Sequence, residues 1–75
     1  MNNIFQLNCI HNEELRARCK ELIEEIPTKD TRKLEQDFDW YLQLKERESF
    51  GSDLFNCYKI YITAIAEEIK RRKNI

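Results

Sequence analysis

The residues of this sequence that could perform nucleophilic chemistry or bind a metal are His11 and three cysteines, Cys9, Cys19 and Cys57. A catalytic histidine would have to lie beside a cysteine and be oriented by a third polar group. Structural zinc sites usually present two close pairs of ligands, and here only Cys9 and His11 are close in sequence. Cys19 is one member of an apolar helical stripe, so we expect Cys19 and Cys57 to be small core residues. The sequence therefore predicts no catalytic residue, no metal site and no cofactor.

Neighbouring carboxylates occur at four places, which are Glu13 and Glu14, Glu24 and Glu25, Asp37 and Asp39, and Glu67 and Glu68. General acid and base catalysis needs two carboxylates in different environments. Adjacent helical residues point about 100° apart, and these pairs are interleaved with Lys and Arg. We therefore expect a solvated face with ion pairs four residues apart, such as Glu67 with Arg71. One glycine cannot build a phosphate-binding loop, so the chain is not expected to be an enzyme.

One basic cluster, Lys70, Arg71, Arg72 and Lys73, stands near the end of the chain. It has two interpretations: a nucleic-acid-binding segment, or cations that complement the dipole of a helix C-terminus. Thirteen basic against fourteen acidic residues give a net charge of -1, which does not attract the whole chain to nucleic acid or to anionic membrane. We favour the helix-terminal interpretation, and nucleic-acid binding remains the alternative.

These residues must be positioned by a small helical chain. Seventy-five residues form one domain, 1–75, and a 41% hydrophobic fraction argues for a folded chain. One Gly and one Pro leave too little turn chemistry for a β-rich fold. No apolar run approaches the ~18 residues of a membrane span, and no targeting segment is evident. An odd cysteine count then fits reduced thiols, and we expect a cytoplasmic protein.

We predict three helices, over about residues 12–26, 30–48 and 52–73, after a short N-terminal arm over residues 1–11. Asn12 is a candidate N-cap of the first helix, Thr28 or Asp30 of the second, and Ser52 or Asp53 of the third. Pro27 ends the first helix, and Gly51 ends the second because glycine adopts a left-handed cap without steric cost. Alternating apolar residues favour an extended arm, although an extra helical turn is also compatible with so short a segment.

The third helix has the widest apolar surface. Its polar residues gather within roughly 80° of the circumference, and its apolar residues cover an arc of about 240°. Such a helix must be buried on two sides, either between the first two helices or partly against a second copy of the chain. The sequence therefore predicts an all-α, three-helix up-down-up bundle with a short N-terminal arm.

More apolar surface is present than this bundle needs. On the second helix, Trp40 and Leu44 lie roughly 120° to 160° from Phe38, on the flank of the main apolar face. The arm could fold back over such residues and give a compact monomer, or they could form a contact surface with Trp40 as its anchor. The predicted partner-binding residues are Trp40, Leu44, Phe50, Ile60, Phe5 and Leu7.

These features predict a small non-enzymatic protein–protein interaction module that binds a larger protein and modulates or inhibits it. Its size, charge and spare aromatic residues are in character with immunity, antitoxin or phage anti-defence proteins, an analogy that rests on no sequence motif. A homodimer is a further possibility. The alternative function is a small nucleic-acid-binding regulator that uses the basic cluster at residues 70–73.

Overall fold

The chain folds into three α-helices, and the computed structural model describes residues 7–74. The helices are α1 (Glu13–Glu25), α2 (Thr31–Arg47) and α3 (Asp53–Lys73). Two short 3-10 turns, η1 (Leu7–Cys9) and η2 (Ile26–Thr28), precede and follow α1. The described residues contain no strand. The predicted all-α three-helix fold is confirmed, and each helix begins and ends within one residue of its predicted bounds.

The helix ends are set by side chains that accept hydrogen bonds from free main-chain N–H groups. Asn12 accepts from the N–H of Leu15 at the start of α1, at 2.9 Å. Asp30 caps α2 and Ser52 caps α3, which decides between the candidates that the sequence offered. Gly51 precedes α3 with a φ of 86°, in the left-handed region that glycine tolerates. Local sequence signals therefore account for where each helix begins.

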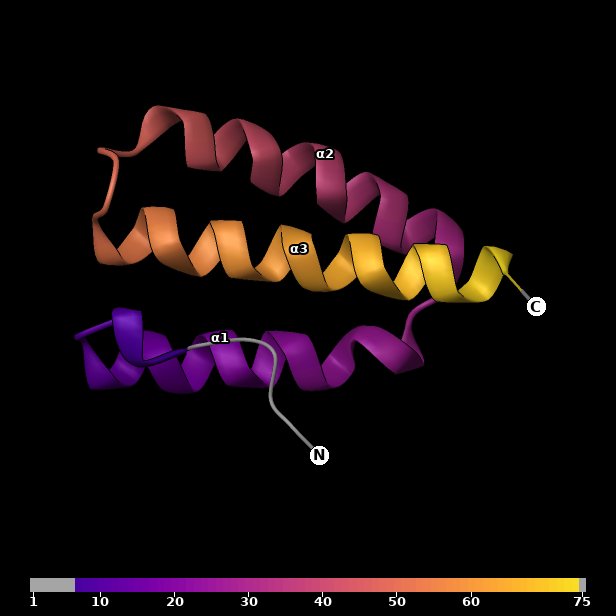
Figure 1. Ribbon diagram of the computed structural model, residues 1–75, viewed down its shortest axis with the longest axis horizontal. Helices are drawn as coiled ribbons and strands as arrows, with labels where there is room; N and C mark the ends of the chain where they lie inside the picture. Colours follow the sequence, from indigo (N-terminus) through magenta and orange to yellow (C-terminus); the bar gives the residue numbers. More distant parts are fainter. Residues whose placement is uncertain (1–6, 75) are drawn as a thin grey trace.

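The three helices lie side by side, with α3 in the middle (Figure 1). The main helix contacts join α3 to α1 on one side and to α2 on the other. The molecule is flat, with extents of 36 × 30 × 16 Å, and α2 runs antiparallel to both of its companions. This central position explains the wide apolar arc of α3, because two helices bury it from opposite sides.

Two groups of buried residues hold the layer together. The first lies where the connection between α1 and α2 meets α3, and consists of Ile26, Leu34, Tyr61, Ala64 and Ile65. The second joins the N-terminal turn, α1 and α3, and consists of Ile10, Cys19, Cys57 and Ile60. Cys19 and Cys57 are therefore core residues, as the apolar stripe predicted. Each group brings together residues from segments far apart in the sequence.

The N-terminal segment packs on the helices where the structure describes it. Leu7–Cys9 forms a 3-10 turn, so of the two conformations compatible with the sequence these residues adopt the helical turn and not the extended one. Ile10 is fully buried, and its carbonyl accepts a hydrogen bond from Arg16 at 3.3 Å. The remainder of the predicted arm, residues 1–6, lies outside the described residues. Within the described part of the chain, no helix has the length and apolar character needed to cross a membrane.

Candidate interaction surface

Trp40 is an exposed aromatic residue on a regular helix. It lies in the middle of α2, and 57% of its surface is accessible. Among residues 7–74 its indole makes no contact with another aromatic ring. Leu44, one helical turn further on, is half-buried. The structure therefore places the predicted anchor Trp40 and its neighbour Leu44 on the same side of α2.

The tyrosines beside Trp40 connect α2 to α3. The ring of Tyr41 lies 5.7 Å from the ring of Tyr58 and 4.8 Å from that of Tyr61, between centroids. Because the two helices are antiparallel, Leu44, after Tyr41, and Leu54, before Tyr58, lie toward the same end of the pair. We call Trp40 and Leu44 the Trp40 surface. It lies on α2, which ring contacts hold in register with α3.

Leu54 is a further exposed apolar residue, and the sequence did not single it out. Its side chain is in the first turn of α3, directly after the Ser52 cap, and 38% of its surface is accessible. A leucine in the first turn of an apolar helix is expected in the core. The sequence signal that could have identified Leu54 as exposed is its position in the first turn of α3. Neighbouring helices cover the middle of a helix more completely than its ends.

A buried polar network stiffens α2 next to Trp40. Asp37, three residues earlier, is only 9% exposed, and its carboxylate accepts hydrogen bonds from Lys29 Nζ at 3.1 Å and from the Tyr61 hydroxyl at 3.3 Å. Lys33 pairs with the second carboxylate oxygen at 3.3 Å. Asp37 was expected on a solvated face, and that expectation is wrong because the Lys29 ammonium and Tyr61 hydroxyl cover it.

The protonation of this network follows from its contacts. Burial alone would raise the pKa of Asp37, but the hydrogen bonds and charges of Lys29 and Lys33 outweigh burial and leave the pKa below its usual range. Burial likewise opposes the charge on Lys29, yet hydrogen bonds to Tyr61 and Asp37 raise the pKa of Lys29. Burial raises the pKa of Tyr61. At neutral pH the network is therefore an ion pair that shares a neutral tyrosine.

Charged side chains of both signs flank Trp40 on α2. Lys33 and Arg47 stand seven residues before and after Trp40, which places both within about 20° of it around the helix. Three acidic residues, Glu35, Asp39 and Glu46, lie roughly 100° to 140° away on the other edge. An exposed indole flanked by polar and charged side chains has the composition of a protein interface.

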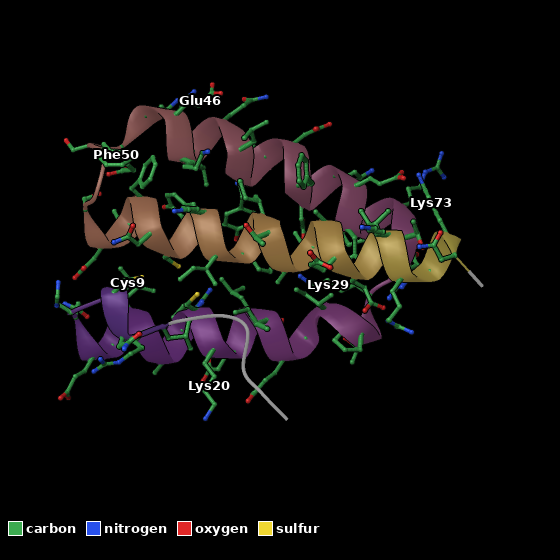
Figure 2. All side chains as sticks on the ribbon, in the orientation of Figure 1. Cys9, Lys20, Lys29, Glu46, Phe50 and Lys73 are labelled. Atoms are coloured by element: carbon green, nitrogen blue, oxygen red, sulfur yellow. The ribbon has the colours of Figure 1, made fainter. Side chains whose placement is uncertain are left out.

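Phe50 is a second exposed aromatic residue, at one end of the molecule. It lies in the connection between α2 and α3, at the opposite end from Lys73 (Figure 2), and is 89% exposed. One side of its ring packs on Phe55, with centroids 5.1 Å apart. Lys45 places its ammonium 5.5 Å from the centre of the Phe55 ring. Phe50 is therefore held in place while almost all of its surface is open.

Two of the predicted contact residues belong to the core or pack against it. Ile60 is 9% exposed and belongs to the core group with Ile10, Cys19 and Cys57. Leu7 packs against the same group. Ile60 is therefore no part of an exposed surface, because the N-terminal turn supplies Ile10 to cover it. Phe5 lies outside the described residues.

The predicted basic cluster is divided by its contacts. Glu68 accepts hydrogen bonds from Arg71 Nη2 at 2.6 Å and from Arg72 Nε at 2.8 Å, and these contacts lower the pKa of Glu68. Arg71 was expected to pair with Glu67, four positions earlier, but it pairs with Glu68, three positions earlier. Lys70 and Lys73 are exposed, and among the ion pairs of residues 7–74 neither takes part. Two of the four cations are therefore engaged within the fold.

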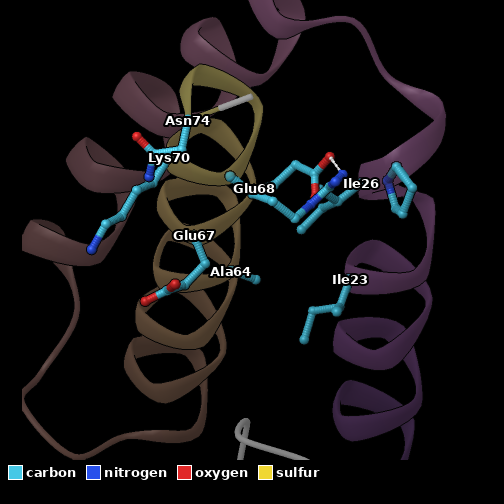
Figure 3. Close-up of a pocket in the computed structure, with 9 residues that line it drawn as sticks. Ile23, Ile26, Ala64, Glu67, Glu68, Lys70 and Asn74 are labelled. Carbon is cyan, nitrogen blue, oxygen red and sulfur yellow. Dashed lines mark hydrogen bonds and ion pairs between the residues drawn. The ribbon is translucent and has the colours of Figure 1, made fainter.

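Two shallow hollows flank the last turns of α3. The first, of about 460 Å³, has a floor of Ile23, Ile26 and Ala64 between α1 and α3, with Glu67 and Lys70 at its rim (Figure 3). The second, of about 690 Å³, lies between α2 and α3. Its lining residues are Glu35, Phe38, Asp39, Ala66, Ile69, Lys70, Lys73 and Asn74. Neither hollow contains a histidine or a cysteine, the nucleophilic residues considered above.

In residues 7–74, no group of three or more His, Cys, Asp or Glu side chains is placed to hold a metal ion. The chain matches no protein-family model, and no solved structure is significantly similar to it.

Proposed function

We propose that this protein is a small binding module that attaches to a larger protein through the Trp40 surface and so modulates or inhibits that partner. The observation that supports this most directly is the 57% exposure of Trp40 on a helix whose neighbouring side chains are fixed. Tryptophan is among the residues most enriched at the centres of protein interfaces. In this proposal the protein acts by contact rather than by catalysis, in the cytoplasm.

Rigidity of the surface favours binding. The Asp37 network and the Tyr41–Tyr58 ring contact hold α2 against α3 before any partner arrives. Less side-chain freedom then has to be lost on association than for a flexible loop. The Trp40 surface is therefore suited to a preformed contact, with Lys33 and Arg47 at its polar rim.

The contacts of the basic cluster at residues 70–73 support nucleic-acid binding less well than the Trp40 surface supports protein binding. Arg71 and Arg72 are bound to Glu68, which leaves Lys70 and Lys73 as the available cations. Two cations neutralise too few phosphates for tight binding at physiological salt. Measurable binding to a nucleic acid duplex at low salt would instead favour the alternative function, a nucleic-acid-binding regulator. Replacing Lys70 and Lys73 with Gln should then abolish that binding.

The proposal is tested by comparing four purified proteins, namely the natural sequence and the variants Trp40→Ala, Phe50→Ala and Gln43→Ala. A partner captured from the native cell is purified, and its affinity for each protein is measured by titration calorimetry. We expect Trp40→Ala to weaken binding at least about tenfold, because hot-spot aromatics contribute about 2 kcal/mol or more. Gln43→Ala, an exposed change on the same helix, is expected to bind as the natural protein does.

Circular dichroism and light scattering complete this test. Helicity of Trp40→Ala must match that of the natural protein, so that lost binding is not lost folding. Undiminished affinity in Trp40→Ala would disprove the proposed surface, and a loss confined to Phe50→Ala would move the contact to the end of the molecule. A solution mass of twice the 9.2 kDa chain that returns to the monomer in Trp40→Ala would identify the partner as a second copy.

A further inference from the structure

Two buried cysteines face each other across the junction of α1 and α3. Cys19, in the middle of α1, is 0% exposed, and Cys57, in the second turn of α3, is 2% exposed. The Cys19 thiol lies 3.9 Å from the carbonyl oxygen of Cys57, and both side chains pack in the same core group. They stand 38 positions apart in the sequence. Tertiary packing has therefore placed the Cys19 thiol against Cys57 within one core group.

The two thiols differ in how readily they ionise. The nearby Cys19 side chain lowers the pKa of Cys57 against the opposing effect of burial, and the positive charge of Arg18 acts in the same direction as Cys19. The same contact with Cys57 and burial raise the pKa of Cys19. Thiolate is the nucleophilic form of cysteine, which favours Cys57 over Cys19 as the attacking thiol. Cys19 is then the second thiol that can resolve a disulfide on Cys57.

The N-terminal turn controls access to this pair. Ile10, directly after η1, is fully buried against Cys19 and Cys57. The turn is fastened to α3 by Asp53, whose carboxylate accepts hydrogen bonds from the N–H groups of His11 at 3.0 Å and Asn12 at 2.9 Å. The His11 and Asn12 bonds are made by exposed groups, and hydrogen bonds open to water are typical of a segment that opens locally. Release of this turn would uncover the thiols without unfolding α2.

We propose that Cys19 and Cys57 are a thiol–disulfide exchange site that forms a reversible intramolecular disulfide with a low-molecular-weight disulfide such as oxidised glutathione. Deprotonated Cys57 attacks one glutathione sulfur, the S–S bond of glutathione breaks, and one glutathione thiolate leaves and takes up a proton. Deprotonated Cys19 then attacks the Cys57 sulfur and releases the second glutathione thiolate. Two protein thiols are oxidised, and one glutathione disulfide is reduced to two thiols.

The disulfide would join α1 to α3 around a closed loop that contains the whole of α2. A covalent link of this kind stabilises a small protein because it restricts the unfolded chain. For a loop of 38 residues in a chain of this size, we expect the Tm to rise by roughly 10 °C or more. Reduction with dithiothreitol should return the Tm to its starting value.

The experiment uses the full chain with Cys9→Ser, so that Cys19 and Cys57 are the only thiols. After incubation of the folded protein with oxidised glutathione, we expect a mass loss of about 2 Da and a peptide pair linked through the two cysteines. The matched control carries Cys9→Ser and Cys19→Ser, and is expected to gain a glutathione adduct with no intramolecular link. A disulfide that forms in urea but never in the folded protein would overturn the proposal, as would a Tm that does not rise.

The role of the N-terminal turn is tested by the rate of oxidation. In the Cys9→Ser protein, Asp53→Ala removes the carboxylate that fastens the turn and should speed disulfide formation about tenfold. Arg72→Gln, which destabilises the fold at the other end of α3, is the control. If both variants speed disulfide formation equally, oxidation requires global unfolding. That result would contradict local opening of the N-terminal turn.

Discussion

The guanidinium of Arg72, in the last turn of α3, donates a hydrogen bond to the main-chain carbonyl of Lys29 at 2.8 Å. Lys29 lies in the connection between α1 and α2, forty-three residues earlier in the chain. Arg72 also donates to the Thr31 hydroxyl at 3.0 Å and binds Glu68 within its own helix. A single side chain therefore joins the end of α3 to the connection between the other two helices.

Replacement of this arginine should destabilise the fold. We expect Arg72→Gln to lower the free energy of unfolding by about 1–3 kcal/mol, because a half-buried charged donor loses several acceptors at once. Arg71→Gln is the matched control, since Arg71 is 65% exposed in its side chain and should change stability by less than about 0.5 kcal/mol. Urea denaturation followed by circular dichroism measures both. Equal effects of the two substitutions would contradict the structural role of Arg72.

The Asp37 carboxylate should make stability depend on pH in the acidic range. Its pKa is lowered in the folded protein, so its contribution is present above the unfolded value of about 3.9 and is lost as pH falls through the lower folded value. Asp37→Asn should reduce stability near neutral pH by about 1–3 kcal/mol and flatten the loss of stability below about pH 4.

The control for that pH profile is Asp39→Asn, which changes an exposed carboxylate on the same helix. Asp53 and Glu68 also have lowered pKa values, so part of the acid dependence is expected to remain in Asp37→Asn. Thermal unfolding measured between pH 2.5 and 7 compares the three proteins. An unchanged pH profile in Asp37→Asn would refute the assigned network.

Trp40 and Leu34 should differ sharply in their effect on folding although both are large apolar residues of α2. Leu34 is fully buried, and Leu34→Ala should cost about 2–5 kcal/mol through lost burial and a residual cavity. Trp40→Ala should change the free energy of unfolding by less than about 1 kcal/mol, since the indole is mostly exposed. Chemical denaturation of both variants tests this, and similar large losses would place Trp40 in the core.

Gly51 should be sensitive to substitution through its backbone alone. Its φ is 86°, and a Cβ added at this position would meet no atom within 4 Å. Gly51→Ala should therefore destabilise the protein by about 1 kcal/mol through conformational strain and not through a clash. Asn tolerates the left-handed region better than Ala, so Gly51→Asn should cost less. The Tm values of the two variants measure the difference, and the reverse order would disprove this explanation.

Several parts of the fold could be predicted because they depend on neighbouring residues. Asn12 and Ser52 bear oxygen acceptors placed to cap the first free N–H groups of the following helix, and both caps form as expected. The 240° apolar arc of the third helix indicated burial on two sides, and α3 lies between α1 and α2. Of the candidate surface, Trp40 and Leu44 could be placed from their angle around α2.

Other parts depended on segments that meet only in the folded chain. Ile60 was expected on a surface, but Ile10 of the N-terminal turn covers it. Asp37 was expected in solvent, yet Lys29 and Tyr61 come from separate elements to surround it. Periodicity describes one helix at a time and carries no information about which residues a distant segment brings to its flank.

The sequence by itself determined the number of helices, their ends and the width of their apolar faces, since capping and periodicity act over a few residues. Tertiary structure alone decided that Cys19 faces Cys57, that Arg72 holds Lys29 and that Trp40 stays exposed beside a buried Asp37. The physical reason is that these contacts join residues 38 and 43 positions apart, or depend on burial by other helices. Local propensity determines where the helices form, and tertiary packing determines which residues their side chains contact.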